Sequence, residues 1–178
     1  MPIDRLHIRP IELADVPALL TIIAESRREY GIADRGVEVL EPADHALFAN
    51  YQRHRSLYFV ALIADEIVGG AGVAPLSGAD QLTCELQRMY LRPDARNRGI
   101  GRELLKHCLA AARQFLFVRC YLETISQMQG ALEFYGRHGF RECKVRHGRT
   151  GHDHNDRWLM RPLRASAQRF ALENSYAT

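Results

Sequence analysis

The chain has 178 residues, of which 47% are hydrophobic and 25% charged, so it is long enough to form one domain with a sizeable core. Its formal net charge is only +3, and apart from one run between residues 88 and 106 the basic residues are scattered, which argues against nucleic acid as the main partner. No apolar run reaches the length of a membrane span and residues 1–10 lack the apolar segment of a signal peptide, so we expect a cytoplasmic protein with no membrane partner.

The N-terminal part predicts a strand followed by two helices. Residues 6–11 alternate as a short strand, and residues 16–28 place their apolar side chains on one helical face. We expect Asp15 to be the N-cap of this helix and Gly31 to end it. A polar loop to residue 41 follows, and residues 42–51 predict the second helix.

The next segment predicts a β-hairpin. Residues 57–64 and 67–73 are rich in β-forming residues and are joined by a two-residue turn. Gly69, Gly70 and Gly72 leave the second strand with few side chains, which is typical either of a bulge or of close approach by other backbone. The pattern does not decide between these two interpretations.

A strand, a basic glycine-containing turn and a helix then follow in direct succession. Residues 82–91 alternate, with Glu85 and Gln87 on one side of the predicted strand and apolar residues on the other. The turn at residues 96–101 leads into a helix that we expect from Gly99 to about Gln114. This order is typical of sites that bind anions.

The physical reason is the start of the helix. Its first turn has unpaired backbone N–H groups and the positive end of the helix dipole. Gly99 and Gly101 allow a bulky anion close to the backbone, and Arg96, Arg98 and Arg102 supply charge and forked donors suited to phosphate. A dinucleotide fingerprint is excluded because its third glycine is missing, and a P-loop because no Gly-Lys-Ser/Thr is present.

The C-terminal part predicts two more helix–strand units. Residues 118–124 form a strand that a helical crossover makes parallel to the strand before it. The next helix begins near residue 128 and ends at Gly139 as C′. Residues 140–146 and 157–163 predict the last two strands, on either side of a polar loop.

Two motifs in this order resemble the GNAT superfamily of N-acetyltransferases. The sequence R-x-x-G-x-G at 96–101 is similar to the loop that binds the pyrophosphate of coenzyme A, and residues 131–140 match the A-x-x-x-Y-x-x-x-G-F helix and turn. The resemblance implies an α/β fold of the α+β type: a mixed, mostly antiparallel sheet of six to seven strands flanked by helices, with one central parallel pair splayed at the cofactor site. We expect residues 1–163 to form a single acetyltransferase domain and residues 164–178 to form a tail that is either a short helix or loose.

The resemblance also implies how acetyl-CoA, the expected cosubstrate, is bound. The backbone of Met89, Tyr90 and Leu91 is expected to hold the pantetheine arm and to face the thioester oxygen. The turn and the first helical turn are expected to bind the pyrophosphate through Arg96, Asn97, Arg98, Gly99, Ile100, Gly101 and Arg102.

One further cofactor position departs from the superfamily's pattern. Many members have an asparagine that bonds the pantetheine where this chain has Met128. We expect that contact to be lost here or to be replaced by Gln127 or Thr124.

The resemblance implies the catalytic groups as well. The acceptor needs a base, because an alkylammonium with a pKa of about 10 is not a nucleophile. Glu85 on the central strand is our first choice and Glu123 on the partner strand our second, although either carboxylate could instead form a salt bridge, for example with Arg88 or Arg119. Tyr135 occupies the position where the superfamily's phenol protonates the departing thiolate; by spacing alone it would be a core aromatic.

The acceptor itself is not identified by any motif. In the superfamily the first two helices and their connecting loop form one wall of the acceptor site, so Arg27, Arg28, Tyr30 and Tyr51 are candidate contacts. Each of these residues could equally be a solvated or packing side chain.

The loop at residues 146–156 is rich in His and Asp. It either lines the acceptor pocket, with Thr150 and His152 near the substrate, or is a mobile polar loop. The H-x-H pair at 152–154 has no fixed helix and no thiol beside it, so we expect no metal.

The resemblance implies that the chain is an N-acetyltransferase. It would move the acetyl group of acetyl-CoA directly to a primary amine of a small molecule, amino acid or peptide in a ternary complex, as a monomer or homodimer. No motif marks a cysteine as an acyl-enzyme nucleophile. The alternative is a non-catalytic acyl-CoA-binding sensor or regulatory module that keeps the loop and lacks the acceptor chemistry.

Overall fold

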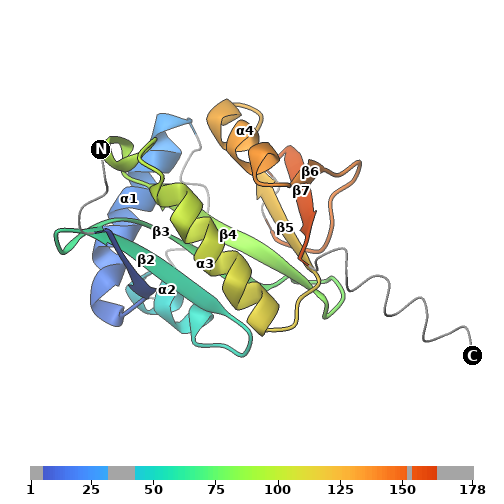
Figure 1. Cartoon of the computed structure of the whole chain (residues 1–178), viewed down its shortest axis with the longest axis horizontal. Coiled ribbons are helices and arrows are strands. Elements are labelled where there is room, and N and C mark those ends of the chain that lie inside the picture. The colour runs from blue at the N-terminus through green and yellow to red at the C-terminus, as the bar shows by residue number, and fades with distance from the viewer. Residues whose placement is uncertain (1–5, 32–42, 152–153, 164–178) are drawn as a thin grey trace, which may run out of the picture.

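A computed structural model of the chain describes residues 6–31, 43–151 and 154–163 (Figure 1). Seven strands form one mixed sheet in the order β1-β2-β3-β4-β5-β7-β6, in which β4 and β5 are parallel and the other neighbours are antiparallel. The strands are β1 (Leu6–Pro10), β2 (Leu57–Ile63), β3 (Glu66–Pro75), β4 (Thr83–Leu91), β5 (Arg119–Thr124), β6 (Arg141–Glu142) and β7 (Arg157–Pro162). The predicted fold class is confirmed.

Helices cover both faces of this sheet. They are α1 (Val16–Glu29), α2 (Ala43–Tyr51), α3 (Ile100–Gln114) and α4 (Gln129–Arg137), with short 3-10 turns at Leu13–Asp15 and Pro93–Ala95. No helix in the described parts of the chain is long and apolar enough to cross a membrane. The predicted loop up to residue 41 and the predicted tail after residue 163 lie outside the described residues.

Two apolar cores lie on opposite faces of the sheet. The first packs α3 and α4 against the strands and contains Leu104, Cys108 and Tyr135. The second packs α1 and α2 against the other face and contains Leu19 and Tyr51. We call these the α3 face and the α1 face; Figure 1 shows α3 crossing the sheet in front of the strands.

Asp15 is the N-cap residue of α1, as predicted, although its carboxylate accepts bonds from Arg9 at 2.7 and 2.8 Å and from the Glu12 N–H at 2.7 Å rather than from the first turn of α1. One local prediction needs correction. The strand predicted at residues 140–146 is only two residues long in β6. The Cys143 N–H still bonds the Trp158 carbonyl, and beyond it the chain turns toward β5, where Arg146 pairs with Glu123.

The glycines of β3 serve two purposes that the sequence left open. Between Gly70 and Gly72 the pairing shifts, so that one residue of β3 faces two of β4, and Arg88 adopts φ +48° at this bulge. The same glycines also leave room for the rings of Tyr58 and Tyr51, which lie where their Cβ atoms would be.

We expect Gly70→Ala to destabilise the fold by about 1–3 kcal/mol, because overpacking a buried site forces side chains and backbone to shift. The added Cβ would meet the Tyr58 ring and lie 2.7 Å from the carbonyl oxygen of Phe59. Urea unfolding measures the effect. Gly130→Ala in α4 is the control, since nothing lies within 4 Å of the Cβ added there; equal stability of the two variants would contradict the packing argument.

Candidate active site

The central feature is a gap between the two parallel strands. β4 and β5 pair only from Thr83 to Glu85 and from Arg119 to Tyr121. Beyond these residues β4 continues to Leu91 and β5 to Thr124 without pairing to each other, and Figure 1 shows the two strands diverging. One edge of β4 is therefore left without a strand partner, so its backbone groups can bond a ligand.

The bulge in β4 determines which backbone groups reach this gap. Because the N–H of Arg92 bonds the Val68 carbonyl of β3, the backbone groups of Leu91 point away from β3 and those of Tyr90 point toward it. The Leu91 carbonyl accepts a 3.1 Å hydrogen bond from Arg96 Nε. Of the three predicted pantetheine contacts, Leu91 is thus oriented toward the gap, whereas the backbone of Tyr90 faces the sheet.

The start of α3 forms a compact cradle beside the same strand. Gly99 is the N-cap with φ +83°, a left-handed conformation that favours glycine, and Asn97 is also left-handed at φ +58°. A Cβ on Gly101 would lie 3.3 Å from Met89 Cε, so this glycine lets the helix approach β4 closely. The free N–H groups of the first turn and the missing Cβ fit a pyrophosphate, as expected for coenzyme A.

The arginines of this turn do not all remain available. Arg96 bonds Glu29 of α1 at 2.7 Å and lies 3.5 Å from Ser26 Oγ, so it ties the turn to α1. Arg102 pairs with Glu103 at 3.1 Å on the surface. Arg98 is exposed, and within the described residues no hydrogen bond or ion pair engages its side chain.

Glu85 is the most unusual ionisable group of the site. Its side chain is buried on the α1 face at the last position where β4 pairs with β5. It accepts a 2.6 Å hydrogen bond from Gln87 Nε2, and Gln87 Oε1 accepts one of 2.9 Å from Tyr51. Burial raises the pKa of Glu85 from its ordinary 4.5 to about 7, and the negative charge of Glu123 adds to this, while the Gln87 bond acts against it.

Glu123 lies on the same face, and hydrogen-bond donors surround its carboxylate. Arg146 donates to both of its oxygens at 3.0 and 3.1 Å, and Tyr121 and Thr150 donate at 2.9 Å each. Burial alone would raise the pKa of Glu123, but these hydrogen bonds outweigh it and hold the pKa below its usual value. A carboxylate in this environment resists protonation.

The salt bridges that we considered for these two glutamates involve other residues. Arg119 pairs with Asp80, and Arg88 makes no ion pair with any described residue. Glu85 likewise has no ionic partner in the described part of the chain.

Tyr135 lies on the opposite, α3 face. Its ring packs edge-on against Phe134 and Phe140, and burial raises the pKa of its phenol. Among the described residues nothing hydrogen-bonds its hydroxyl. Nearby, Thr124 Oγ1 lies 3.7 Å from the sulfur of Met128, the residue before α4, so Thr124 contacts the residue that replaces the asparagine in this sequence.

The predicted acceptor contacts are only partly brought together. Tyr51 is buried and bonds Gln87, and Thr150 bonds Glu123, so both belong to the polar networks of the α1 face. Arg28 is exposed and Tyr30 half-buried at the end of α1. His152 lies outside the described residues, and within the described ones no cluster of ligating side chains could hold a metal.

The sequence pattern did not identify two residues that bond the candidate catalytic glutamates. Gln87 connects Glu85 to Tyr51, and the alternation of β4, which puts Glu85 and Gln87 on one side, would have been sufficient to find it. Arg146 neutralises Glu123 across the sheet, and no spacing in the sequence indicates this contact.

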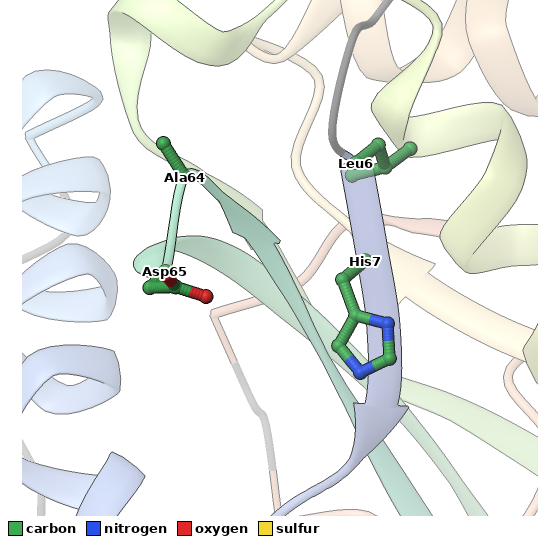
Figure 2. Close-up of a pocket in the computed structure, with 4 residues that line it drawn as sticks. All are labelled: Leu6, His7, Ala64 and Asp65. Carbon is green, nitrogen blue, oxygen red and sulfur yellow. The ribbon is translucent and has the colours of Figure 1, made fainter.

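Surface hollows lie elsewhere on the molecule. One is lined by Leu6 and His7 of β1 and by Ala64 and Asp65 of the turn between β2 and β3 (Figure 2). Its β1 side is the edge of the sheet, three strands away from β4 in the sheet order. None of the predicted catalytic or cofactor residues lines it.

Comparison with known proteins finds sequence relatives among acetyltransferases. The model of the Acetyltransferase (GNAT) family matches residues 20–140. The uncharacterized N-acetyltransferase YjgM of Escherichia coli (strain K12) is 37% identical over 146 residues, which is 82% of this chain and 87% of that protein.

Two solved structures share the fold. An acetyltransferase of the GNAT family from Staphylococcus aureus Mu50 has a TM-score of 0.79 at 24% identity, covering 90% of this chain and 100% of that one. The PaiA N-acetyltransferase of Thermoplasma acidophilum, solved with coenzyme A, has a TM-score of 0.68 at 18% identity, covering 89% and 99%.

Proposed function

Because this chain belongs to the GNAT family and is an N-acetyltransferase, we propose that it transfers the acetyl group of acetyl-CoA directly to a primary amine in a ternary complex. The observation that carries the proposal is Glu85, a buried carboxylate without an ionic partner among the described residues, placed where β4 and β5 separate. Acetyl-CoA supplies an activated acyl group as a thioester. Residues of this chain bind the thioester and move the protons.

The cradle at the start of α3 binds the pyrophosphate, through the first-turn N–H groups after Gly99 and through Arg98. The unpaired edge of β4 holds the pantetheine arm, and Leu91 is the residue whose backbone groups are aimed at it. A related N-acetyltransferase was solved with coenzyme A, which supports the same ligand here.

Glu85 is the general base. With a pKa of about 7 it takes the proton of the acceptor ammonium, directly or through a water, and it is ionised for a useful fraction of the time at neutral pH. Gln87 and Tyr51 hold the carboxylate in place. Glu123 is a poorer base because Arg146 lowers its proton affinity.

Tyr135 is the general acid. The amine nitrogen forms its bond to the thioester carbonyl carbon and loses its second proton to solvent, the carbon–sulfur bond breaks, and the phenol of Tyr135 gives its proton to the departing thiolate and regains one from solvent. Its raised pKa means that the phenol carries this proton at neutral pH. Its place on the α3 face, opposite Glu85, lets acid and base act from the two sides of the gap.

The cysteines support direct transfer rather than an acyl-enzyme. Cys84, Cys108 and Cys120 are fully buried, and burial raises the pKa of Cys108. Burial also raises the pKa of the partly buried Cys143. None of these thiols is activated as a nucleophile.

The proposal is tested by titrating acetyl-CoA, coenzyme A and NADH into the protein, followed by an assay of thiol release with a panel of primary amines. We expect micromolar binding of both coenzymes, none of NADH, and acetylation of some amines. No binding of either coenzyme would disprove the cofactor assignment. Binding with no transfer to any amine would disprove the proposed reaction.

We expect Tyr135→Phe to lower kcat by about 100-fold, the contribution typical of a positioned acid, with little change in acetyl-CoA affinity. The ring contacts with Phe134 and Phe140 are retained, so the fold is preserved. Turnover and coenzyme titration measure the two effects separately. An unchanged kcat would remove Tyr135 from the mechanism.

A further inference from the structure

One arginine of α1 has an unsatisfied donor beside the site. Arg27 Nε is buried, and neither it nor the rest of the side chain has a hydrogen-bond partner among the described residues. The other buried unpartnered nitrogen of the described chain, Trp158 Nε1, belongs to β7, two strands from β4. Since a buried donor without a partner is costly, each such group calls for an explanation.

Arg27 is held at the open end of β4. The residues on either side of it are fixed by Arg96, which contacts Ser26 and Glu29 and also bonds the carbonyl of Leu91 at the end of β4. This network fixes the last turn of α1 against the part of β4 that has no β5 partner. The position of Arg27 is therefore set by bonds that do not use its own guanidinium.

A second arginine without an ionic partner among the described residues lies at the bulge of β4. Arg88 occupies the β4 bulge at φ +48°, and its backbone carbonyl accepts a 2.9 Å hydrogen bond from Tyr58, so the backbone is fixed while the side chain is exposed. No hydrogen bond or ion pair with a described residue engages its guanidinium. Bulges commonly redirect one side chain next to an active site.

Tyr90 packs into the core of the α1 face together with Ile23, which lies one helical turn before Arg27 on α1. Burial raises the pKa of Tyr90, and the charges of Arg27 and Arg88 both oppose that rise. The charge of Arg88 also acts on Glu85. Along β4, Arg88 lies between Glu85, the proposed base, and Tyr90.

We propose that the acceptor carries a carboxylate close to its amine, as a free amino acid does, and that Arg27 and Arg88 bind this carboxylate while Glu85 receives the ammonium proton. The inference rests on the proposed function and names its substrate class. Two guanidiniums offer the forked donors that a carboxylate accepts. Other arginines are already engaged: Arg146 pairs with Glu123 and Arg9 with Asp15.

The coenzyme's phosphates are a poor alternative for these two arginines. The cradle at the start of α3 packs with Met89 and Leu91 into the core of the α3 face. Arg27 follows Ile23 of the core on the other face by one helical turn, and Arg88 precedes Tyr90 of that core by two residues on β4. Loss of either guanidinium should therefore leave coenzyme binding intact.

The first test compares matched acceptors that differ only in the carboxylate: leucine with isopentylamine and leucinamide, and phenylalanine with phenethylamine. We expect kcat/KM to be at least about tenfold higher for the carboxylate-bearing member of each pair, the effect of a charged hydrogen bond. Equal or faster transfer to the bare amines would overturn this inference and leave the proposed function standing. No transfer to any member of the panel would overturn both.

The second test uses Arg27→Gln and Arg88→Gln with the best carboxylate-bearing acceptor. We expect KM for that acceptor to rise by about tenfold or more in each variant, with the KM for the matched bare amine and the affinity for acetyl-CoA unchanged. Arg53→Gln, an exposed arginine between α2 and β2, is the control of equal charge change. The inference is wrong if both variants weaken acetyl-CoA binding instead, or if acceptor KM stays at the wild-type value.

Discussion

Glu85→Gln is expected to lower kcat by about 100-fold to 10,000-fold, the range that removal of a general base produces. Glutamine fills the same buried space and can still contact Gln87, so the site is preserved while the proton acceptor is lost. Steady-state kinetics with a saturating amine measure the effect, and acetyl-CoA titration confirms that the cofactor site is intact.

The pH profile distinguishes loss of the base from a general disturbance. In the wild type, kcat should rise as Glu85 loses its proton at a pH of about 7. In Glu85→Gln, kcat should not rise with pH in this range. Glu133→Gln on the exposed surface of α4 should retain the rise. If Glu123→Gln abolishes the rise and Glu85→Gln does not, the base is Glu123.

The same substitution should stabilise the fold in alkaline solution. The folded-state pKa of Glu85 is raised above its ordinary 4.5, so its contribution to stability is lost as pH rises from 4.5 to 7 and is level above that. The stability lost over this pH range is at most about 3 kcal/mol. Urea unfolding should show Glu85→Gln gaining on the wild type at pH 8 and not at pH 4.5; a constant difference would contradict the raised pKa.

Much of the fold could be predicted because its signals are local. The helical spacing of α3 and the glycine at its start predicted the helix within a residue. The crossover between β4 and β5 predicted the one parallel pair, because a helix joins them. Gly139 is left-handed after α4, as its predicted place at C′ requires.

The features that could not be predicted depend on contacts distant in sequence. The strand expected at residues 140–146 is short because Arg146 bonds Glu123, and no local pattern records a pairing across two strands. The bulge at Arg88 needs both the glycines of β3 and the rings of Tyr51 and Tyr58. Arg96 belonged to the predicted phosphate turn, yet its side chain bonds α1, which only the packing of helix on sheet determines.

The Glu123–Arg146 pair is the polar contact whose loss should cost most stability. Arg146→Met is expected to destabilise the fold by about 3–5 kcal/mol at neutral pH, because removing one member of a buried pair leaves the other charge uncompensated. The Glu123 side chain is only 1% exposed, whereas that of Arg146 is 28% exposed. Tyr121 and Thr150 still donate to the carboxylate, which favours the lower end of the range.

The pH dependence of this loss identifies its cause. In the wild type the lowered pKa of Glu123 contributes stability that is present above its ordinary 4.5 and is lost as pH falls through the lowered value. Without Arg146, burial dominates and the pKa rises, so the variant should lose stability as pH increases, and the difference from wild type should widen from pH 4 to 7.5 in urea unfolding. Adding Glu123→Gln should recover most of the lost stability, since no buried carboxylate then lacks its partner. A deficit that is equal at all pH values, or that persists in the double variant, would instead mean that Arg146 acts by packing residues 143–151 against β5.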